Sequence, residues 1–167
     1  MRRNVAVVAG ALLLSFASIW AQQTAPAAAD SLEIIGEHKT VTFSRADFRA
    51  LAHVSLTVHN GHTGTTETYS GVPVAVLLEK VDAPLGKRLR GEAMRTFVVA
   101  TGSDGYAVVL SLAEVDPDFH QGQVIVADAQ EGLAIGKDGP FRLIDSDDKR
   151  PARWVRDLVA MQVKRAQ

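Results

Sequence analysis

Cysteine is absent from the 167-residue sequence, and aromatic residues make up only 6% of it. Without a thiol, the chain has no disulfide framework, no thiolate nucleophile and no thiolate ligand for a metal. An excess of one charge is also lacking, because 18 Lys and Arg residues face 19 Asp and Glu residues. Nucleic-acid-binding domains carry a marked basic excess, so a nucleic-acid partner is not expected.

The motifs of several common enzyme classes are missing as well. The sequence contains no Gly-x-Ser-x-Gly elbow, no P-loop, no His-Glu-x-x-His and no dinucleotide-binding glycine pattern. These motifs expose a nucleophile, hold a phosphate chain or ligate zinc. Simple hydrolase and nucleotide-binding functions are therefore without support, and the catalytic residues, if any, are unknown.

The N-terminal segment has the pattern of a secretory signal peptide. Two arginines follow Met1, and residues 5–20 then contain no charged side chain. A basic start, an apolar centre and small residues near the end are typical of cleaved signals. The apolar run is about 16 residues, whereas a membrane span needs roughly 20. We predict a signal peptide at residues 1–21, cleavage between Ala21 and Ala29, a periplasmic or secreted location, and no stable membrane span afterwards.

Two segments follow the predicted signal. Residues 22–30 are rich in Ala, Gln, Thr and Pro and predict a flexible leader, because they offer few large apolar side chains for a core. Residues 31–167 match the usual size of one domain, so we expect a single domain.

Within this domain, β-prone runs alternate with glycine-bearing turns. The predicted strands are 32–35, 39–43, 54–58, 65–69, 96–101, 106–111, 123–128, 141–145 and 158–164. A loop is expected at 59–64 and a turn at 70–73, followed by a helix over 74–81. Capping-box patterns at Ser44 and Ser111 predict two further short helices. The expected fold class is α+β, predominantly β.

Two local patterns suggest chemistry. His59 and His62 could supply two nitrogen ligands to a metal, with Glu67 or His53 as a third ligand, although a solvated loop explains the same spacing. Asp-Gly at a predicted hairpin indicates a turn before it indicates a substrate site.

Basic residues gather near the C-terminus. Arg142, Arg150 and Arg153 are among seven Lys and Arg residues after position 141. Guanidinium groups bind anionic ligands or acidic protein surfaces through paired hydrogen bonds. A solvated face with local ion pairs is the alternative interpretation.

The order of several motifs resembles the molybdopterin-binding domain of the sulfite-oxidase-like oxidoreductases. The motifs are Tyr69-Ser70-Gly71-Val72-Pro73 before Leu77-Leu78, Ser103-Asp104-Gly105-Tyr106, residues 123–128, Gly139-Pro140-Phe141-Arg142-Leu143 and Arg153-Trp154-Val155. The resemblance implies a compact, mainly β fold with a few helices. In active members it also implies a pterin-bound molybdenum that performs oxygen-atom or electron transfer.

One departure from the family pattern concerns the metal. Active relatives ligate molybdenum through a cysteine at a place that corresponds roughly to residues 58–61, and no thiolate exists in this chain. The resemblance carries over only Asp104, Gly105, Tyr106, Gly139, Pro140 and Arg142 as matching positions. Together with the local patterns, the candidate ligand-binding residues are His59, Asn60, Asp104, Gly105, Tyr106, Arg142, Arg150 and Arg153.

Three functions remain open at this point. The first is an exported, non-catalytic member of the fold that binds a small anionic ligand or a protein partner and needs no cofactor. The second is a molybdopterin-dependent oxidoreductase with altered metal ligation. The third is an accessory subunit that docks onto a redox complex.

Overall fold

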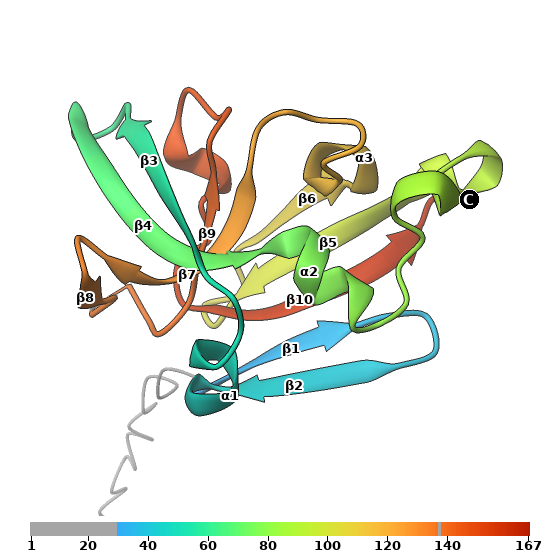
Figure 1. Ribbon diagram of the computed structural model, residues 1–167, viewed down its shortest axis with the longest axis horizontal. Helices are drawn as coiled ribbons and strands as arrows, with labels where there is room; N and C mark the ends of the chain where they lie inside the picture. The colour runs from blue at the N-terminus through green and yellow to red at the C-terminus, as the bar shows by residue number, and fades with distance from the viewer. Residues whose placement is uncertain (1–29, 137) are drawn as a thin grey trace, which may run out of the picture.

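A computed structural model of the protein describes residues 30–136 and 138–167. The signal peptide predicted at 1–21, and the leader at 22–30 except its last residue, lie outside the described residues. Two five-stranded sheets make up most of the described structure, with short helices at their ends and edges (Figure 1). Within the described ranges, no helix has the length and apolar character of a membrane span.

The first sheet has the strand order β2-β1-β10-β5-β6. Its strands are β1 (Ser31–Ile35), β2 (Thr40–Ser44), β5 (Thr96–Gly102), β6 (Ala107–Ser111) and β10 (Leu158–Arg165). The first and last strands of the fold, β1 and β10, lie side by side in parallel, with Glu33 opposite Ala160. The other pairs of this sheet are antiparallel, including the predicted hairpin of β5 and β6.

The second sheet is antiparallel and centres on β7. It contains β3 (Val54–Asn60), β4 (Thr65–Pro73), β7 (Val124–Gln130), β8 (Leu133–Ala134) and β9 (Arg142–Asp145). The order is β3-β4-β7-β8, and β9 also pairs with β7. In Figure 1 this sheet lies to the left of the first sheet.

Short helices connect the strands. They are α1 (Arg45–Arg49), α2 (Val74–Glu79) and α3 (Leu112–Val115), with 3₁₀ turns η1 (Gly86–Arg88), η2 (Gly91–Arg95) and η3 (Pro151–Arg153). Both predicted capping boxes are confirmed: the side chains of Ser44 and Ser111 cap α1 and α3, and Asp47 and Glu114 bond back to the cap residues.

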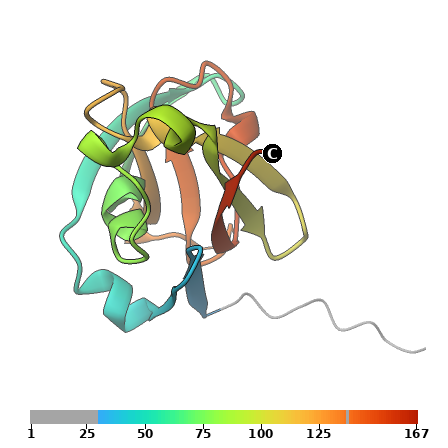
Figure 2. The same ribbon diagram turned by 90° about the vertical axis from the view of Figure 1, so that its right-hand side faces the viewer.

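The second sheet separates two apolar clusters. The larger cluster contains residues of both sheets and of the helices, among them Ile34, Leu78 and Val126. Figure 2 shows the ribbons of these sheets and helices from a second side. The smaller cluster lies on the other face of β7, where Ile125 and Ala127 point away from Val126 because side chains alternate along a strand. It consists of Val58, Tyr69, Ile125, Ala127, Ile135, Ile144 and Trp154.

The helices and strands predicted from the sequence agree with the structure, and the main differences in their bounds are at β3, β4 and α2. The turn predicted at 70–73 is wrong, because β4 continues through these residues to Pro73 and pairs there with β7. The loop predicted at 59–64 begins two residues later, since β3 extends to Asn60. Helix α2 ends at Glu79 rather than at 81, and β8 was not predicted.

Candidate functional site

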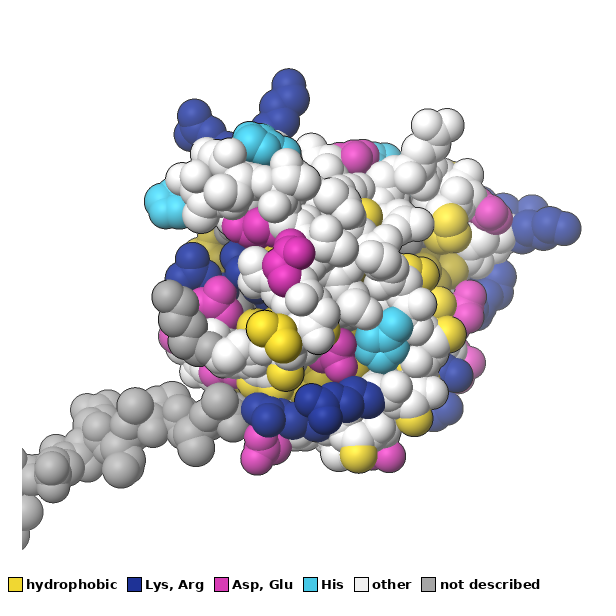
Figure 3. All heavy atoms as spheres, turned by 60° about the vertical axis from the view of Figure 1, so that its left-hand side comes forward, with side chains coloured by type: hydrophobic (Ala, Val, Ile, Leu, Met, Phe, Trp, Pro, Cys, Tyr) yellow, Lys and Arg dark blue, Asp and Glu magenta, His cyan; other side chains and the backbone are white. Residues whose placement is uncertain are grey.

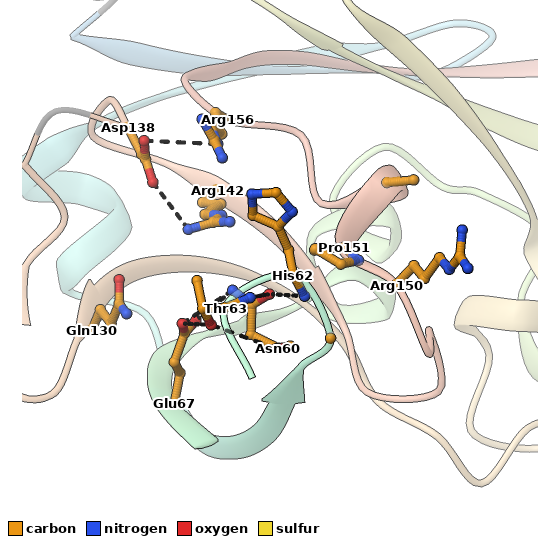
Figure 4. Close-up of a pocket in the computed structure, with 12 residues that line it drawn as sticks. Asn60, His62, Thr63, Glu67, Gln130, Asp138, Arg142, Arg150, Pro151 and Arg156 are labelled. Atoms are coloured by element: carbon orange, nitrogen blue, oxygen red, sulfur yellow. Dashed lines mark hydrogen bonds and ion pairs between the residues drawn. The ribbon is translucent and has the colours of Figure 1, made fainter. Parts of the chain in front are cut away.

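A cleft of about 700 Å³ opens beside the smaller apolar cluster. It lies where the β3–β4 turn, the segment before β9 and the segment around η3 meet (Figure 4). On the face that is drawn as spheres, acidic and basic side chains are interspersed rather than separated into large patches of one sign (Figure 3). The residues that line the cleft are Asn60, Gly61, His62, Thr63, Glu67, Gln130, Asp138, Arg142, Arg150, Pro151, Ala152 and Arg156.

Arg142 is the most deeply placed charge of the cleft. Strand β9 pairs it with Ala127, so its side chain lies on the smaller-cluster face of the sheet, and the residue is only 5% exposed. The centre of its guanidinium lies 5.6 Å from the ring centroid of Tyr69 and 5.8 Å from that of Trp154. Such aromatic contacts stabilise a cation that has lost part of its water.

The hydrogen bonds of Arg142 leave part of its guanidinium available. Nη1 donates to Asp138 Oδ2 at 3.0 Å and to the hydroxyl of Tyr69 at 3.2 Å. The buried Nε has no partner among the described residues. A buried donor without a partner is costly, and a water or an ion that reaches it is one way in which proteins offset that cost.

Two more arginines lie at the rim of the cleft. Arg156 Nε is 3.7 Å from Asp138 Oδ1, and Arg150 and Arg156 are both exposed. With Arg142 they outnumber the two carboxylates of the cleft, those of Glu67 and Asp138. The positive balance favours an anionic ligand.

Glu67 organises the opposite wall. Its carboxylate accepts hydrogen bonds from the Asn60 amide at 3.0 Å, from the Thr63 and Thr65 hydroxyls, and from the Tyr69 hydroxyl at 2.7 Å. The amide oxygen of Asn60 in turn accepts from the backbone nitrogens of His62 and Thr63. The β3–β4 turn is therefore tied to the floor of the cleft.

These contacts shift two pKa values in opposite directions. Burial raises the pKa of Glu67, but the four donated hydrogen bonds outweigh it and hold this pKa below the ordinary value. Burial raises the pKa of Tyr69, and its hydrogen bond to Glu67 raises it further. Tyr69 therefore remains a neutral donor to Glu67 at neutral pH.

Arg153, a predicted ligand-binding residue, does not line the cleft. Its guanidinium donates to Asp148, to Glu114 at 2.8 Å and to the buried Asp145 at 3.1 Å. The bonds to Asp148 contribute most to raising the pKa of Arg153. This ion-pair group fastens η3 to α3 and β9, so Arg153 supports the cleft wall instead of facing a ligand.

The predicted residues of the β5–β6 hairpin also lie outside the cleft lining. Asp104 Oδ1 accepts from the backbone nitrogen of Tyr106 at 2.8 Å, and Gly105 has a φ of 83°, as a tight turn requires. The Tyr106 hydroxyl donates to the carbonyl of Ala152 at 2.6 Å. Because Ala152 lines the cleft, the hairpin positions the wall that contains it.

The two histidines proposed as metal ligands are placed differently. His62 lines the cleft, whereas His59 is exposed on β3 and does not. Glu67 is occupied by four donors, and His53 pairs with Asp128. Across the ranges 30–136 and 138–167, no group of three or more His, Asp or Glu side chains is arranged to hold a metal.

The sequence did not identify Thr63, Gln130, Asp138 or Arg156 as site residues, and it indicated Glu67 only as a possible third metal ligand. For Glu67 a signal existed, because Thr65, Glu67 and Tyr69 alternate along one strand and therefore share a face. Asp138 and Arg156 lie far apart in the sequence and come into contact because the tertiary structure places the segment before β9 beside the segment after η3.

The arrangement of sheets and helices is also found in a solved structure. The crystal structure of the sulfane dehydrogenase SoxCD from Paracoccus pantotrophus matches with a TM-score of 0.61 and 19% sequence identity. The match covers 80% of this chain and 37% of that chain, so this chain spans little more than a third of its neighbour. The likeness shows the fold, in agreement with the mainly β fold that the resemblance implied.

No protein-family model and no curated relative match the chain.

The side chains of the cleft do not fit a thiolate-bound molybdenum. Of residues 58–61, Val58 is buried in the apolar cluster, and Asn60 uses both its amide oxygen and its amide nitrogen in hydrogen bonds. The remaining polar side chains of the cleft carry guanidinium, carboxylate, hydroxyl, amide and imidazole groups, none of which is a soft sulfur ligand. The arginines, in contrast, fit an anion.

Proposed function

We propose that this chain is an exported protein with a sulfite-oxidase-like fold that binds a small anion in the arginine cleft and performs no molybdenum chemistry. The observation that carries the proposal is Arg142, a buried cation that is held over two aromatic rings and lines the cleft. The guanidinium of Arg142 is already ordered and largely desolvated in the folded protein. Binding an anion therefore requires little further loss of hydration or side-chain entropy from this group.

The rest of the cleft supports the same conclusion. Arg150 and Arg156 add exposed cations at its rim, and His62 and Gln130 can adjust their hydrogen bonding to an anion. No thiolate is available for the metal of the redox enzymes that share the fold. The cleft therefore supports recognition better than electron or oxygen-atom transfer.

A calorimetric titration with inorganic phosphate tests the proposal. The wild-type protein should bind, and the variant Arg142→Gln should bind at least about tenfold more weakly, because a neutral amide cannot replace a charge-assisted hydrogen bond. Arg95→Gln is the matched control, since Arg95 lies at the end of η2, outside the cleft, and pairs with Glu92. Equal binding by the wild type and Arg142→Gln would contradict the proposal.

Elemental analysis separates this function from an oxidoreductase with altered metal ligation. Protein purified from the exported fraction of molybdenum-replete cells should contain neither molybdenum nor an oxidisable pterin. One molybdenum per chain would overturn the proposal in favour of the enzyme.

A further inference from the structure

One carboxylate stands among the arginines of the cleft, where a simple anion receptor would carry only donors. Asp138 Oδ2 accepts from Arg142 Nη1 at 3.0 Å, and Oδ1 lies 3.7 Å from Arg156 Nε. The side chain lines the cleft and remains 21% exposed. A carboxylate accepts about four hydrogen bonds, so Asp138 keeps acceptor capacity for a ligand.

The other carboxylate of the cleft has no such capacity. Glu67 accepts hydrogen bonds from four side chains, among them the buried hydroxyl of Tyr69. Asp138 is therefore the group that meets an incoming anion as an acceptor. Figure 4 shows it beside Arg142 and Arg156, with a contact to each, and away from Glu67.

The position of Asp138 is fixed before any ligand arrives. Its carbonyl oxygen accepts from the backbone nitrogen of Asp157 at 2.6 Å, and its carboxylate is tied to the buried Arg142. A group that is already ordered distinguishes between ligands more sharply than one that can turn away.

An acceptor placed among donors discriminates between oxyanions of the same shape. Every oxygen of sulfate is an acceptor, so sulfate would face Asp138 with like charge and no hydrogen bond. Hydrogen phosphate has the same tetrahedral form but keeps a proton, which it can donate to Asp138 while its other oxygens accept from the arginines. Sites built to receive a ligand proton reject analogues that lack it, because a polar group is then left unpaired.

We propose that the cleft selects oxyanions that carry a proton, with hydrogen phosphate as the representative ligand, and that Asp138 determines this selectivity. The inference rests on the anion-binding function proposed above and adds the chemical class of the ligand.

Competing titrations with phosphate and sulfate at neutral pH provide the test. The wild type should bind phosphate at least about tenfold more tightly than sulfate. In Asp138→Asn, the amide keeps an acceptor for Arg142 and gains a donor for sulfate, so sulfate should bind more tightly and the ratio should approach one. Asp118→Asn, an exposed site outside the cleft, should keep the wild-type ratio.

The outcomes separate the two proposals. Equal affinities of the wild type for the two anions, with loss of both in Arg142→Gln, would overturn the selectivity and leave anion binding intact. No binding of either anion by the wild type would overturn both. If Asp138→Asn does not fold, the wild-type ratio alone decides.

Discussion

The carboxylate of Glu67 connects the cleft to the pH dependence of stability. Four donated hydrogen bonds hold its pKa in the folded protein below the ordinary value of 4.5, despite the opposing effect of burial. A carboxyl group whose pKa is lower in the folded state stabilises the protein above its unfolded pKa. This stabilisation is lost as the pH falls from about 4.5 through the folded pKa.

Glu67→Gln should therefore lower the free energy of unfolding at neutral pH by about 1–3 kcal/mol, because its donors lose a charged acceptor. The difference from the wild type should shrink at an acidic pH, below the ordinary value of 4.5, as the wild-type carboxyl group itself becomes protonated. Urea denaturation at the two pH values measures both quantities. Glu79→Gln, at an exposed position of α2, is the control and should show no such change. A difference that does not depend on pH would contradict the role of the charge.

At the scale of single residues, sequence reasoning found the right residue types but could not assign their partners. Asn60, Arg142 and Arg150 were predicted to bind a ligand, and all three line the cleft. Arg153 looked equivalent to Arg150 in the sequence, yet it is enclosed by carboxylates from α3, from β9 and from the turn after β9. Their convergence depends on tertiary structure, which local sequence does not specify.

Among the strands, β4 fixes the position of the cleft most directly. It contains Glu67 and Tyr69 and lies between β3 and β7. The pairing of β4 with β7 shifts register between Ser70 and Gly71. At Gly71 the backbone of β7 approaches so closely that a Cβ would overlap the carbonyl of Val126. Only glycine fits this approach without displacing a strand.

Gly71→Ala should lower the free energy of unfolding by about 1–3 kcal/mol, since the added methyl group forces the two strands apart. Thermal or chemical denaturation followed by circular dichroism measures the effect. Gly136→Ala is the matched control, because a Cβ there has no atom within 4 Å. If Gly71→Ala lowers the free energy of unfolding no more than Gly136→Ala does, β4 and β7 can move apart at little energetic cost, which would contradict this prediction.

Elements were easier to predict than their ends. β-prone runs between glycine-bearing turns predicted every strand of the described residues except β8, and two serines with an acidic residue three positions later predicted α1 and α3. Gly71 and Pro73 favour a turn at residues 70–73 in the sequence, because glycine and proline usually interrupt strands. In the fold, Gly71 permits close approach at the register shift, and Pro73 stands at the last position of β4.

Across the whole molecule, the proposed anion-binding cleft and its structural support belong to different sheets. Each residue found to line the cleft belongs to the second sheet or to the segments that connect its strands and lead into β10. The first sheet supplies the opposite wall of the larger apolar cluster. A change that destabilises the first sheet should therefore abolish the proposed binding only by unfolding the protein, and not by removing a group that contacts the ligand.

Deletion of residues 158–167 tests this division, because it removes β10 without removing any residue found to line the cleft. β10 lies between β1 and β5, and its Leu158 and Met161 are fully buried. The truncated protein should lose its cooperative unfolding transition, as measured by calorimetry. Deletion of Gln167 alone, an exposed residue, should leave the transition unchanged. A cooperative transition in the truncated protein would show that the second sheet folds independently.

The parallel pairing of β1 with β10 also governs the timing of folding during synthesis. Because the ribosome releases the chain from its N-terminus, β1 and β2 emerge long before the strand that joins them to β5. The first sheet remains open until β10, at Leu158–Arg165, has emerged, because β10 is the strand that joins β1 to β5. For a chain that crosses a membrane unfolded, as in the proposed export, this delay would keep the first sheet from closing until β10 has been made.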